Sequence, residues 1–246
     1  MSPNLLYDMH CHAYDLEDLE AIFEADKDIV IVAVSDDLES LLRVLELERM
    51  YPGRVYACAG FHPWSIRDGA LHQVDTIVRL ASREGLGCVG EVGLDRRFLG
   101  LETWSLQVRI FREFLRLAVD IGAFVNIHAP DAWSEALGEL IGLSVERAMF
   151  HWYTGPQDLV EVIGEMGYKI SINPAIKIQE KHARIAATTP LKYIVFESDA
   201  PYNYRGLKLA PPMIRESIAL VAKLKNTTQN HVEEAAESNS RRLLIV

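Results

Sequence analysis

Eight short apolar runs recur along this chain of 246 residues, separated by longer amphipathic segments. Most of the runs are rich in Val, Ile, Phe or Tyr and are too short to be helices, which is typical of buried strands. Eight strand–helix units of about 31 residues each suit a right-handed βα repeat that closes into a (β/α)8 TIM barrel. The expected strands are Leu5–Met9, Ile29–Ala33, Val55–Gly60, Gly87–Gly90, Ala123–Ile127, Arg147–Phe150, Tyr168–Ile172 and Tyr193–Phe196.

The segments between the runs carry helix signals. Asp36-Asp37 precedes LESLLRVLELERM as an N-cap, and Pro52-Gly53 ends that helix. The longest helical pattern, residues 103–121, ends at Gly122, a good C-terminal cap. Residues 211–246 predict two more helices, the last of which packs on the barrel. No linker or shift in composition interrupts the chain, so we expect residues 1–246 to form a single α/β domain.

An open doubly wound sheet is the alternative architecture. A nucleotide-binding sheet of that kind needs a glycine-rich turn after its first strand, and the sequence there is HCHAYD. The barrel is therefore favoured.

Charge and cysteine content limit the function. The net charge of −10 argues against an extended grip on nucleic acid, although divalent cations could still hold a phosphate locally. The first strand starts near Leu5 and no apolar run approaches membrane-spanning length, so we expect a cytoplasmic protein with no membrane partner. Cys11, Cys58 and Cys88 form no CxxC motif or paired framework and are expected to be buried free thiols.

Histidines and carboxylates gather where the apolar runs end. Five of the eight histidines lie there, whereas about one is expected by chance. Imidazoles and carboxylates delivered from the ends of several strands are how a barrel builds a metal site. The residues concerned are His10, His12, His62, Glu91, His128, His151 and Asp199. Each of them alone has an ordinary explanation as a packed, capping or solvated residue, but together they predict a metal centre.

Spacing assigns the supporting residues. His10 and His12 lie two apart, so on a strand they face the same side, and Asp8 shares that parity and could accept a hydrogen bond from a ligand imidazole. Cys11 has the opposite parity and is excluded as a ligand. Glu91 lies between two glycines that let backbone approach closely, and in a barrel mouth its carboxylate could bridge two cations.

Other acidic residues follow the fourth and eighth strands. Asp95 is expected to orient a ligand rather than to bind metal. Asp199 could bind a metal and accept the proton of an attacking water, with Glu197 supporting it from two residues deeper. We therefore expect Asp199 and Glu91 to be the catalytic residues.

The remaining polar residues near strand ends are candidates for substrate contact. His62 is expected to touch substrate rather than metal, and Arg96 and Arg97 could bind a phosphate. Lys177, Arg205 and Lys208 also follow strand ends, although solvated loop charge is the commoner explanation for any of them. The other three histidines, His72, His182 and His231, are expected on the surface. No GxSxG motif or strand-end cysteine supports a serine or cysteine nucleophile.

Across the whole chain these motifs resemble TatD-type metal-dependent hydrolases. The segments that carry the resemblance, in order, are DMHCHAYD, GFHP, CVGEVGLD, VNIHAPDAW, HWYTG, GYKISINP and YIVFESDAPYN. As a set they are highly specific, although each alone is not. The resemblance implies a TIM barrel of the amidohydrolase type that binds two divalent ions and hydrolyses phosphodiesters, chiefly as a deoxyribonuclease.

The resemblance also assigns ligands. His10, His12, Glu91 and Asp199 would hold one ion. Glu91, His128 and His151 would hold the other, with Glu91 bridging the two, and His62 would lie near the substrate phosphate. Nitrogen and oxygen ligands suit Mg²⁺, Mn²⁺ or Zn²⁺.

Three of these motifs depart from the family pattern. The family usually has Arg where this chain has Pro130, a second histidine where it has Trp64, and HCFSG where it has HWYTG. None of the changed residues is an expected ligand, and all three motifs lie towards the expected substrate side.

The leading hypothesis is therefore a two-metal hydrolase acting on DNA ends, short oligonucleotides or small phosphate esters, with a monomer favoured. The more apolar substrate side favours an alternative, in which the same metals serve a lactonase, deaminase or aminoacyl-ester hydrolase. A binding or regulatory protein without turnover is the third hypothesis, which the complete set of ligand residues disfavours.

Overall fold

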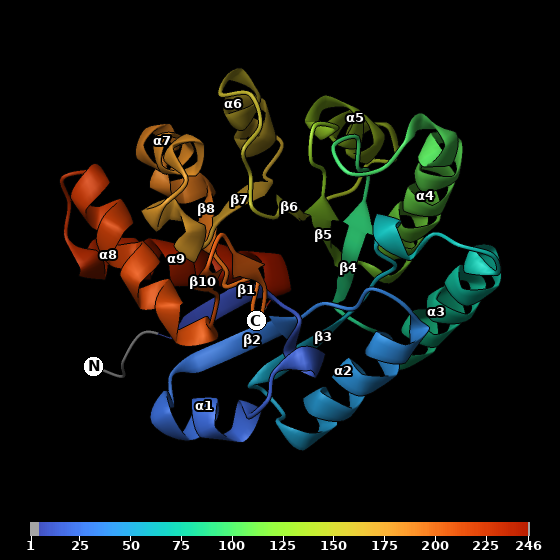
Figure 1. Cartoon of the computed structure of the whole chain (residues 1–246), viewed down its shortest axis with the longest axis horizontal. Coiled ribbons are helices and arrows are strands. Elements are labelled where there is room, and N and C mark those ends of the chain that lie inside the picture. The colour runs from blue at the N-terminus through green and yellow to red at the C-terminus, as the bar shows by residue number, and fades with distance from the viewer. Residues whose placement is uncertain (1–4, 246) are drawn as a thin grey trace.

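The computed structural model describes residues 5–245 and contains eight parallel strands paired in sequence order, surrounded by helices (Figure 1). The strands are β1 (Leu6–Cys11), β2 (Ile29–Ala33), β3 (Val55–Ala59), β4 (Cys88–Gly93), β5 (Phe124–His128), β6 (Ala148–Phe150), β7 (Lys169–Ile172) and β8 (Ile194–Phe196). The helices are α1 (Leu19–Ala25), α2 (Leu38–Met50), α3 (Ala70–Glu84), α4 (Trp104–Ile121), α5 (Trp133–Gly142), α6 (Asp158–Glu165), α7 (Glu180–Thr188), α8 (Ile214–Leu224) and α9 (Gln229–Leu244). The expected (β/α)8 barrel is confirmed.

Hydrogen bonds just beyond β8 join the last strand to the first. The Asp199 N–H donates to the His10 carbonyl at 3.0 Å, and the His12 N–H donates to the Ala200 carbonyl at 2.9 Å. The Asp8 carboxylate accepts the Ser198 N–H at 2.8 Å. These contacts hold the two chain segments that carry His10, His12 and Asp199 against each other.

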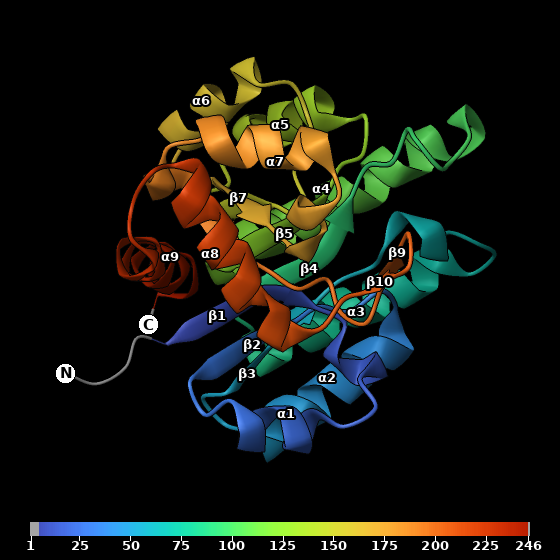
Figure 2. The same ribbon diagram turned by 60° about the vertical axis from the view of Figure 1, so that its left-hand side comes forward.

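The core has an inner and an outer layer. Residues inside the barrel, such as Met9, Val32 and Phe124, form one buried cluster, and a larger cluster packs between the strands and the helices. The last helix, α9, reaches the inner cluster through Leu243, and its Asn239 donates to the carbonyl of Ile194 where β8 begins. Figure 2 shows α9 at the side of the barrel where β1 begins, which leaves the opposite end for a site.

Two strands carry irregularities where expected metal ligands occur. The pairing of β1 with β2 shifts between Asp8 and Cys11, and the pairing of β4 with β5 shifts between Val89 and Val92. Such bulges bend a strand and re-aim a side chain. His10 and Glu91 lie within these two irregular stretches. Both strands also extend further than the sequence predicted, to Cys11 in β1 and to Gly93 in β4.

Helix ends agree well with the sequence signals. Asp37 caps α2 in a capping box with Ser40, and Gly122 ends α4 with a left-handed φ of 67°. The two helices expected in the C-terminal segment are α8 and α9. Within residues 5–245, every helix is too short or too polar to span a bilayer.

The expectation of three free thiols was wrong for two of them. Cys58 and Cys88 are paired residues on β3 and β4 and form a disulfide, with Cα atoms 4.5 Å apart. Cys11 is the buried free thiol. The pairing depends on strand register, which the linear spacing of 30 residues does not reveal.

Alkylation before and after reduction tests this disulfide. Unfolded in denaturant without reductant, the protein should take up one iodoacetamide per chain, at Cys11, and three after reduction, as counted by mass spectrometry. A Cys11→Ser variant is the control and should take up none before reduction. Three labels without reductant would contradict the disulfide.

Gly60 follows β3 in a position that leaves no room for a side chain. A Cβ atom there would lie 2.3 Å from backbone atoms of Ser35, Gly90 and Glu91. Because backbone cannot move aside as a flexible side chain can, Gly60→Ala should lower the free energy of unfolding by about 3 kcal/mol. Urea denaturation measures the change.

Gly138→Ala is the matched control. Gly138 lies within α5 and has open space where a Cβ would be. Alanine there should stabilise the protein by up to about 1 kcal/mol. Equal stability of the two variants would contradict the close approach at Gly60.

Candidate metal centre

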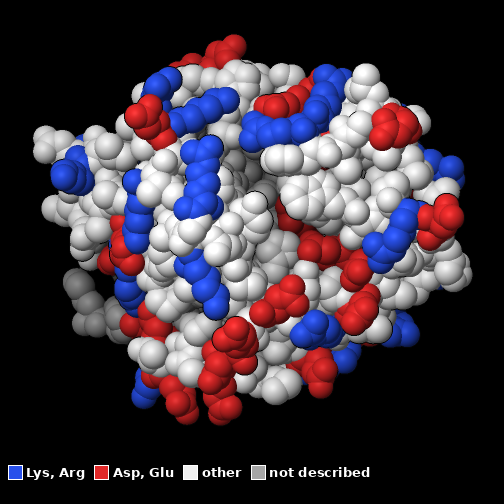
Figure 3. Space-filling model, viewed as in Figure 1, with Lys and Arg blue, Asp and Glu red and all other residues white. Residues whose placement is uncertain are grey.

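The structure brings the expected ligand residues together at the end of the barrel opposite α9. Within residues 5–245, four groups of side chains each offer ligand atoms within 4.8 Å of one another: His10 with His12 and Asp199, His10 with Glu91 and His151, His62 with Glu91 and His128, and His12 with Asp36 and Glu91. In the view of Figure 3, acidic side chains gather at a central hollow, and Lys and Arg line one side of it.

Glu91 lies in the middle of the cluster, with 2% of its surface exposed. One carboxylate oxygen, Oε2, is 3.5 Å from His10 Nε2 and 3.6 Å from His12 Nε2. The other, Oε1, is 2.9 Å from His128 Nδ1 and 3.3 Å from His151 Nε2. The two oxygens therefore face two different sets of imidazoles.

A buried amide fixes the tautomer of His10. The Asn126 amide nitrogen donates to the Met9 carbonyl at 2.8 Å, which turns the amide oxygen towards His10 Nδ1 at 2.9 Å. His10 Nδ1 must therefore carry the proton. The lone pair of Nε2 is then free, and it points into the cluster near Glu91 and Asp199.

A carboxylate does the same for His12. Asp36 Oδ2 lies 3.3 Å from His12 Nδ1 and accepts a 2.6 Å hydrogen bond from the hydroxyl of Tyr14. A carboxylate only accepts hydrogen bonds, so Nδ1 is the donor and the Nε2 lone pair faces Asp199, 3.5 Å away.

The third and fourth imidazoles follow the same rule. Asp95 Oδ2 lies 2.9 Å from His128 Nε2, which leaves Nδ1 facing Glu91. Glu197 Oε1 lies 3.2 Å from His151 Nδ1, which leaves Nε2 facing Glu91. Four histidines thus present lone pairs to the cluster, each held from behind by an acceptor.

His62 has the opposite arrangement. Its Nδ1 accepts the Trp64 N–H at 3.1 Å, so in the neutral imidazole the proton is on Nε2, which points at Glu91 Oε1 from 3.5 Å. Burial lowers the pKa of His62, which favours that neutral form. His62 therefore offers the cluster a hydrogen-bond donor rather than a lone pair.

Mutual charge sets the titration of the cluster. Burial alone would raise the pKa of Glu91, but the surrounding imidazoles outweigh it and hold this pKa well below its usual range. Burial alone would lower the pKa of His128, but its hydrogen bond to Asp95 and the negative charge of nearby Glu91 raise it to about 9. Protons therefore balance the buried carboxylates, and a bound cation would displace them.

Two buried polar atoms of the cluster, Glu91 Oε1 and His128 Nδ1, are better suited to binding a metal ion than to bonding with each other. Glu91 Oε1 and His128 Nδ1 are 2.9 Å apart, yet among residues 5–245 neither has a hydrogen-bond partner of acceptable geometry. A buried polar atom without a partner costs free energy. These two atoms face the same region, where further imidazoles and carboxylates also lie. Mn²⁺ and Zn²⁺ in proteins bind such combinations of nitrogen and oxygen ligands.

The expected supporting residues are placed differently from one another. Asp95 holds His128, as an orienting residue does. Within residues 5–245, Asp8 accepts hydrogen bonds from the backbone N–H groups of His10 and Ser198 and from no imidazole, so the contact expected from its parity was wrong. Glu197 lies against His151 and the Trp152 N–H, rather than against Asp199 as expected.

The arginines expected at the substrate already have carboxylate partners. Arg97 makes two hydrogen bonds to Asp131, at 2.9 and 2.7 Å. Arg96 pairs with Glu135 and lies over the ring of Trp104. Both remain partly exposed at the mouth of the barrel.

Sequence reasoning missed Asn126 and Asp36. Asn126 lies two residues before His128 in β5 and so on the same face, and this spacing could have identified it. Asp36 was considered only as part of the helix cap, which Asp37 provides. His182, expected on the surface, is fully buried, with Nε2 accepting the Asn173 N–H. That expectation was wrong because α7 turns this histidine inward, against the loop after β7.

One departure from the family pattern has a structural role. The Trp64 indole N–H donates to Asp95 at 2.7 Å, so this residue holds the carboxylate that holds His128. Its ring also meets Phe98 edge to face, with centroids 5.4 Å apart. Trp64 and Phe98, both exposed by more than half, form an aromatic wall beside the cluster.

Comparisons with known proteins agree with this geometry. The family model described as TatD related DNase matches residues 7–245. An uncharacterised metal-dependent hydrolase of Methanocaldococcus jannaschii is 29% identical, covering 95% of this chain and 94% of its own. The human deoxyribonuclease TATDN3 is 26% identical, covering 97% and 94%. The crystal structure of the TatD homolog YJJV from Escherichia coli superposes with a TM-score of 0.83 at 24% identity, covering 98% of each chain.

Removing the acceptor behind His12 should weaken metal binding. Asp36→Ala removes the carboxylate that accepts the His12 Nδ1 proton, and loss of such an outer contact lowers metal affinity by about 10- to 100-fold. Titration of the metal-free protein with Mn²⁺ or Zn²⁺ in a calorimeter measures the affinity.

Asp37→Ala is the matched control, one residue further along the chain. It removes the cap of α2 and should cost about 1 kcal/mol of stability while leaving metal affinity unchanged. Wild-type metal affinity in Asp36→Ala would show that Asp36 does not hold a ligand.

Proposed function

This chain belongs to the TatD-related DNase family of metal-dependent hydrolases, and from that premise we propose that it cleaves phosphodiester bonds of DNA ends or short oligonucleotides. The observation that carries the proposal is the set of four imidazoles whose free lone pairs converge with Glu91 and Asp199. Such a set is suited to binding divalent cations.

The donor set suits two divalent ions, which we propose to be Mg²⁺, Mn²⁺ or Zn²⁺. His10, His12 and Asp199 would hold one ion, and His128 and His151 would hold the other, with Glu91 shared between them. Ions bound there would lower the pKa of a water towards neutrality and offset the charge that builds on phosphoryl oxygens. The division of Glu91's two oxygens between two sets of imidazoles supports this arrangement.

The chain's own groups then have distinct tasks. Asp199 would orient the attacking water and accept its proton, because its carboxylate oxygen lies within the cluster, 3.5 Å from both His10 Nε2 and His12 Nε2, and its backbone N–H is tied to His10. His62 donates its Nε2 hydrogen to an oxygen of the substrate phosphate. A neutral imidazole with that hydrogen directed into the centre is suited to this contact.

The walls of the mouth favour single-stranded ends. Trp64 and Phe98 flank one side, and Trp152 flanks another with Tyr202 and Tyr204, whose ring centroids lie 6.0 and 5.0 Å from its own. Bases stack on such rings without regard to sequence. The net charge of −10 disfavours a long duplex footprint, so a short terminus is the better fit.

The same aromatic walls also favour the second candidate, hydrolysis of a lactone or aminoacyl ester. An apolar substrate would be held by the rings, and the same centre would polarise its carbonyl. Assays of both substrate classes with one metal-loaded preparation separate the two candidates.

We also propose that the protein acts in the cytoplasm as a monomer. The Cys58–Cys88 disulfide is uncommon in that compartment. Both sulfurs are buried inside the barrel, so reducing thiols would reach them only when the fold opens.

The Asp199→Asn variant tests the proposed function. Amide nitrogen in place of a carboxylate oxygen removes a metal ligand and the proton acceptor, so cleavage of end-labelled single-stranded DNA should fall about a thousandfold or more. Asp120→Asn, an exposed change on α4, should retain wild-type cleavage. Full activity in Asp199→Asn, or in wild type after chelation of metals, would refute the proposal.

A further inference from the structure

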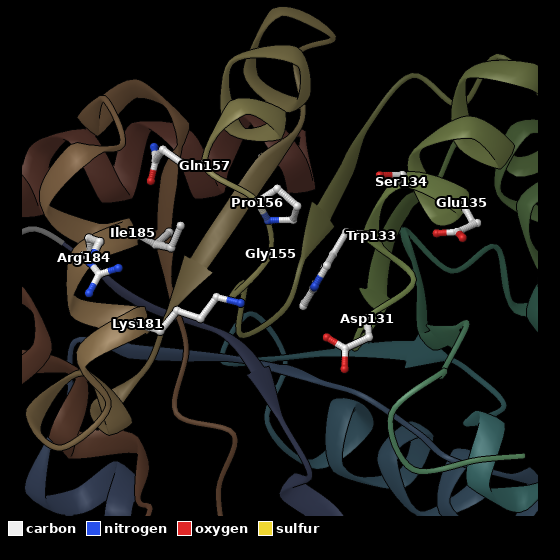
Figure 4. A pocket seen from close by; sticks show the side chains of 10 residues that line it. All are labelled: Asp131, Trp133, Ser134, Glu135, Gly155, Pro156, Gln157, Lys181, Arg184 and Ile185. Carbon is white, nitrogen blue, oxygen red and sulfur yellow. The ribbon is translucent and has the colours of Figure 1, made fainter.

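A cavity of about 440 Å³ is lined by residues that take no part in the chemistry described above. Its walls come from the segments that follow His128 and His151, which supply Asp131, Trp133 and Gly155, and from α7 (Figure 4). Pockets of this size hold small ligands or single nucleotides.

The cavity is electropositive. Lys181 and Arg184 of α7 line it, and within residues 5–245 neither forms an ion pair. The two acidic residues in its wall are neutralised by arginines, Asp131 by Arg97 and Glu135 by Arg96. Two positive charges therefore remain uncompensated.

An unpaired hydrogen-bond donor lies in the wall of the cavity. Trp133 is 5% exposed, and its Nε1 has no hydrogen-bond partner in the described part of the chain. Figure 4 shows this indole entering from α5, with its nitrogen towards the middle of the cavity. A buried N–H without an acceptor costs free energy, which an incoming anionic oxygen would recover.

The N-terminus of α5 adds to the positive electrostatic potential of the cavity. This helix of ten residues has no side chain capping its first turn, where Ser134 lines the cavity. Uncapped N–H groups and the helix dipole attract anions. Two free cations, an orphaned indole N–H and an uncapped helix start all match one ligand chemistry.

We propose that this cavity binds a phosphate group, the one next to the phosphate that is hydrolysed. Lys181 and Arg184 supply the charge, and Trp133 supplies a directed donor. The assignment to the neighbouring phosphate of the substrate rests on the proposed phosphodiesterase function, whereas phosphate binding itself does not. The enzyme would accordingly prefer substrates that carry at least two phosphates.

Phosphate binding can be measured without turnover. Calorimetric titration of the full chain with inorganic phosphate, with metal bound and after chelation, should reveal one site that survives chelation. The double variant Lys181→Gln/Arg184→Gln should weaken that site about tenfold or more, because each lost charge removes a charge-assisted contact. Lys27→Gln, an exposed change before β2 at the other end of the barrel, should bind as wild type.

The indole gives an independent readout. In a ¹H–¹⁵N spectrum, the Nε1 signal that disappears in Trp133→Phe should shift on addition of phosphate to wild type. The double variant should also raise the KM for a short single-stranded oligonucleotide. Both residues are exposed, so its folding is not at risk.

The outcomes are separable. Absence of phosphate binding after chelation, or equal binding by wild type and the double variant, would overturn the phosphate site. Failure of wild type to cleave DNA would contradict the proposed function and leave the phosphate titration as a valid test of the cavity.

Discussion

A buried carboxylate surrounded by imidazoles is the constraint on which the rest of this structure depends. Glu91 is almost fully removed from water, where an isolated charge would be prohibitively costly. Its neighbours offset that cost only because four strands deliver histidines to the same point. The arrangement stores positive charge around Glu91 as protons, and divalent cations can take their place. Stability and metal binding are therefore properties of one network.

The barrel supplies the aim of these side chains as well as their position. Shifts in strand pairing occur at His10 and at Glu91, where regular alternation would direct the side chain elsewhere. Behind the cluster, Asn126, Asp36, Asp95 and Glu197 each fix one imidazole tautomer. The Trp64 N–H fixes the opposite tautomer in His62, with the proton on Nε2. This tautomer suits a contact to substrate rather than to a metal ion.

Much of this could be predicted from the sequence, because βα periodicity and strand-end histidines are local patterns. The predictions that were wrong concern contacts between residues far apart in the sequence. The disulfide depends on the register of β3 against β4, and the contact of Glu197 with His151 depends on how β6, β7 and β8 pair. Asp8 followed strict alternation in the prediction, but a bulge in β1 breaks it. His182 was predicted on the surface, but α7 packs against the loop after β7 and buries it.

Anomalous diffraction from a crystal grown with Mn²⁺ would show whether these side chains form the proposed binuclear cation site with Glu91 shared. We expect two anomalous peaks on either side of Glu91. One should lie within bonding distance of His10, His12 and Asp199, and the other within bonding distance of His128 and His151. A peak coordinated by His62 Nε2, or no peak within the cluster, would contradict the proposed site.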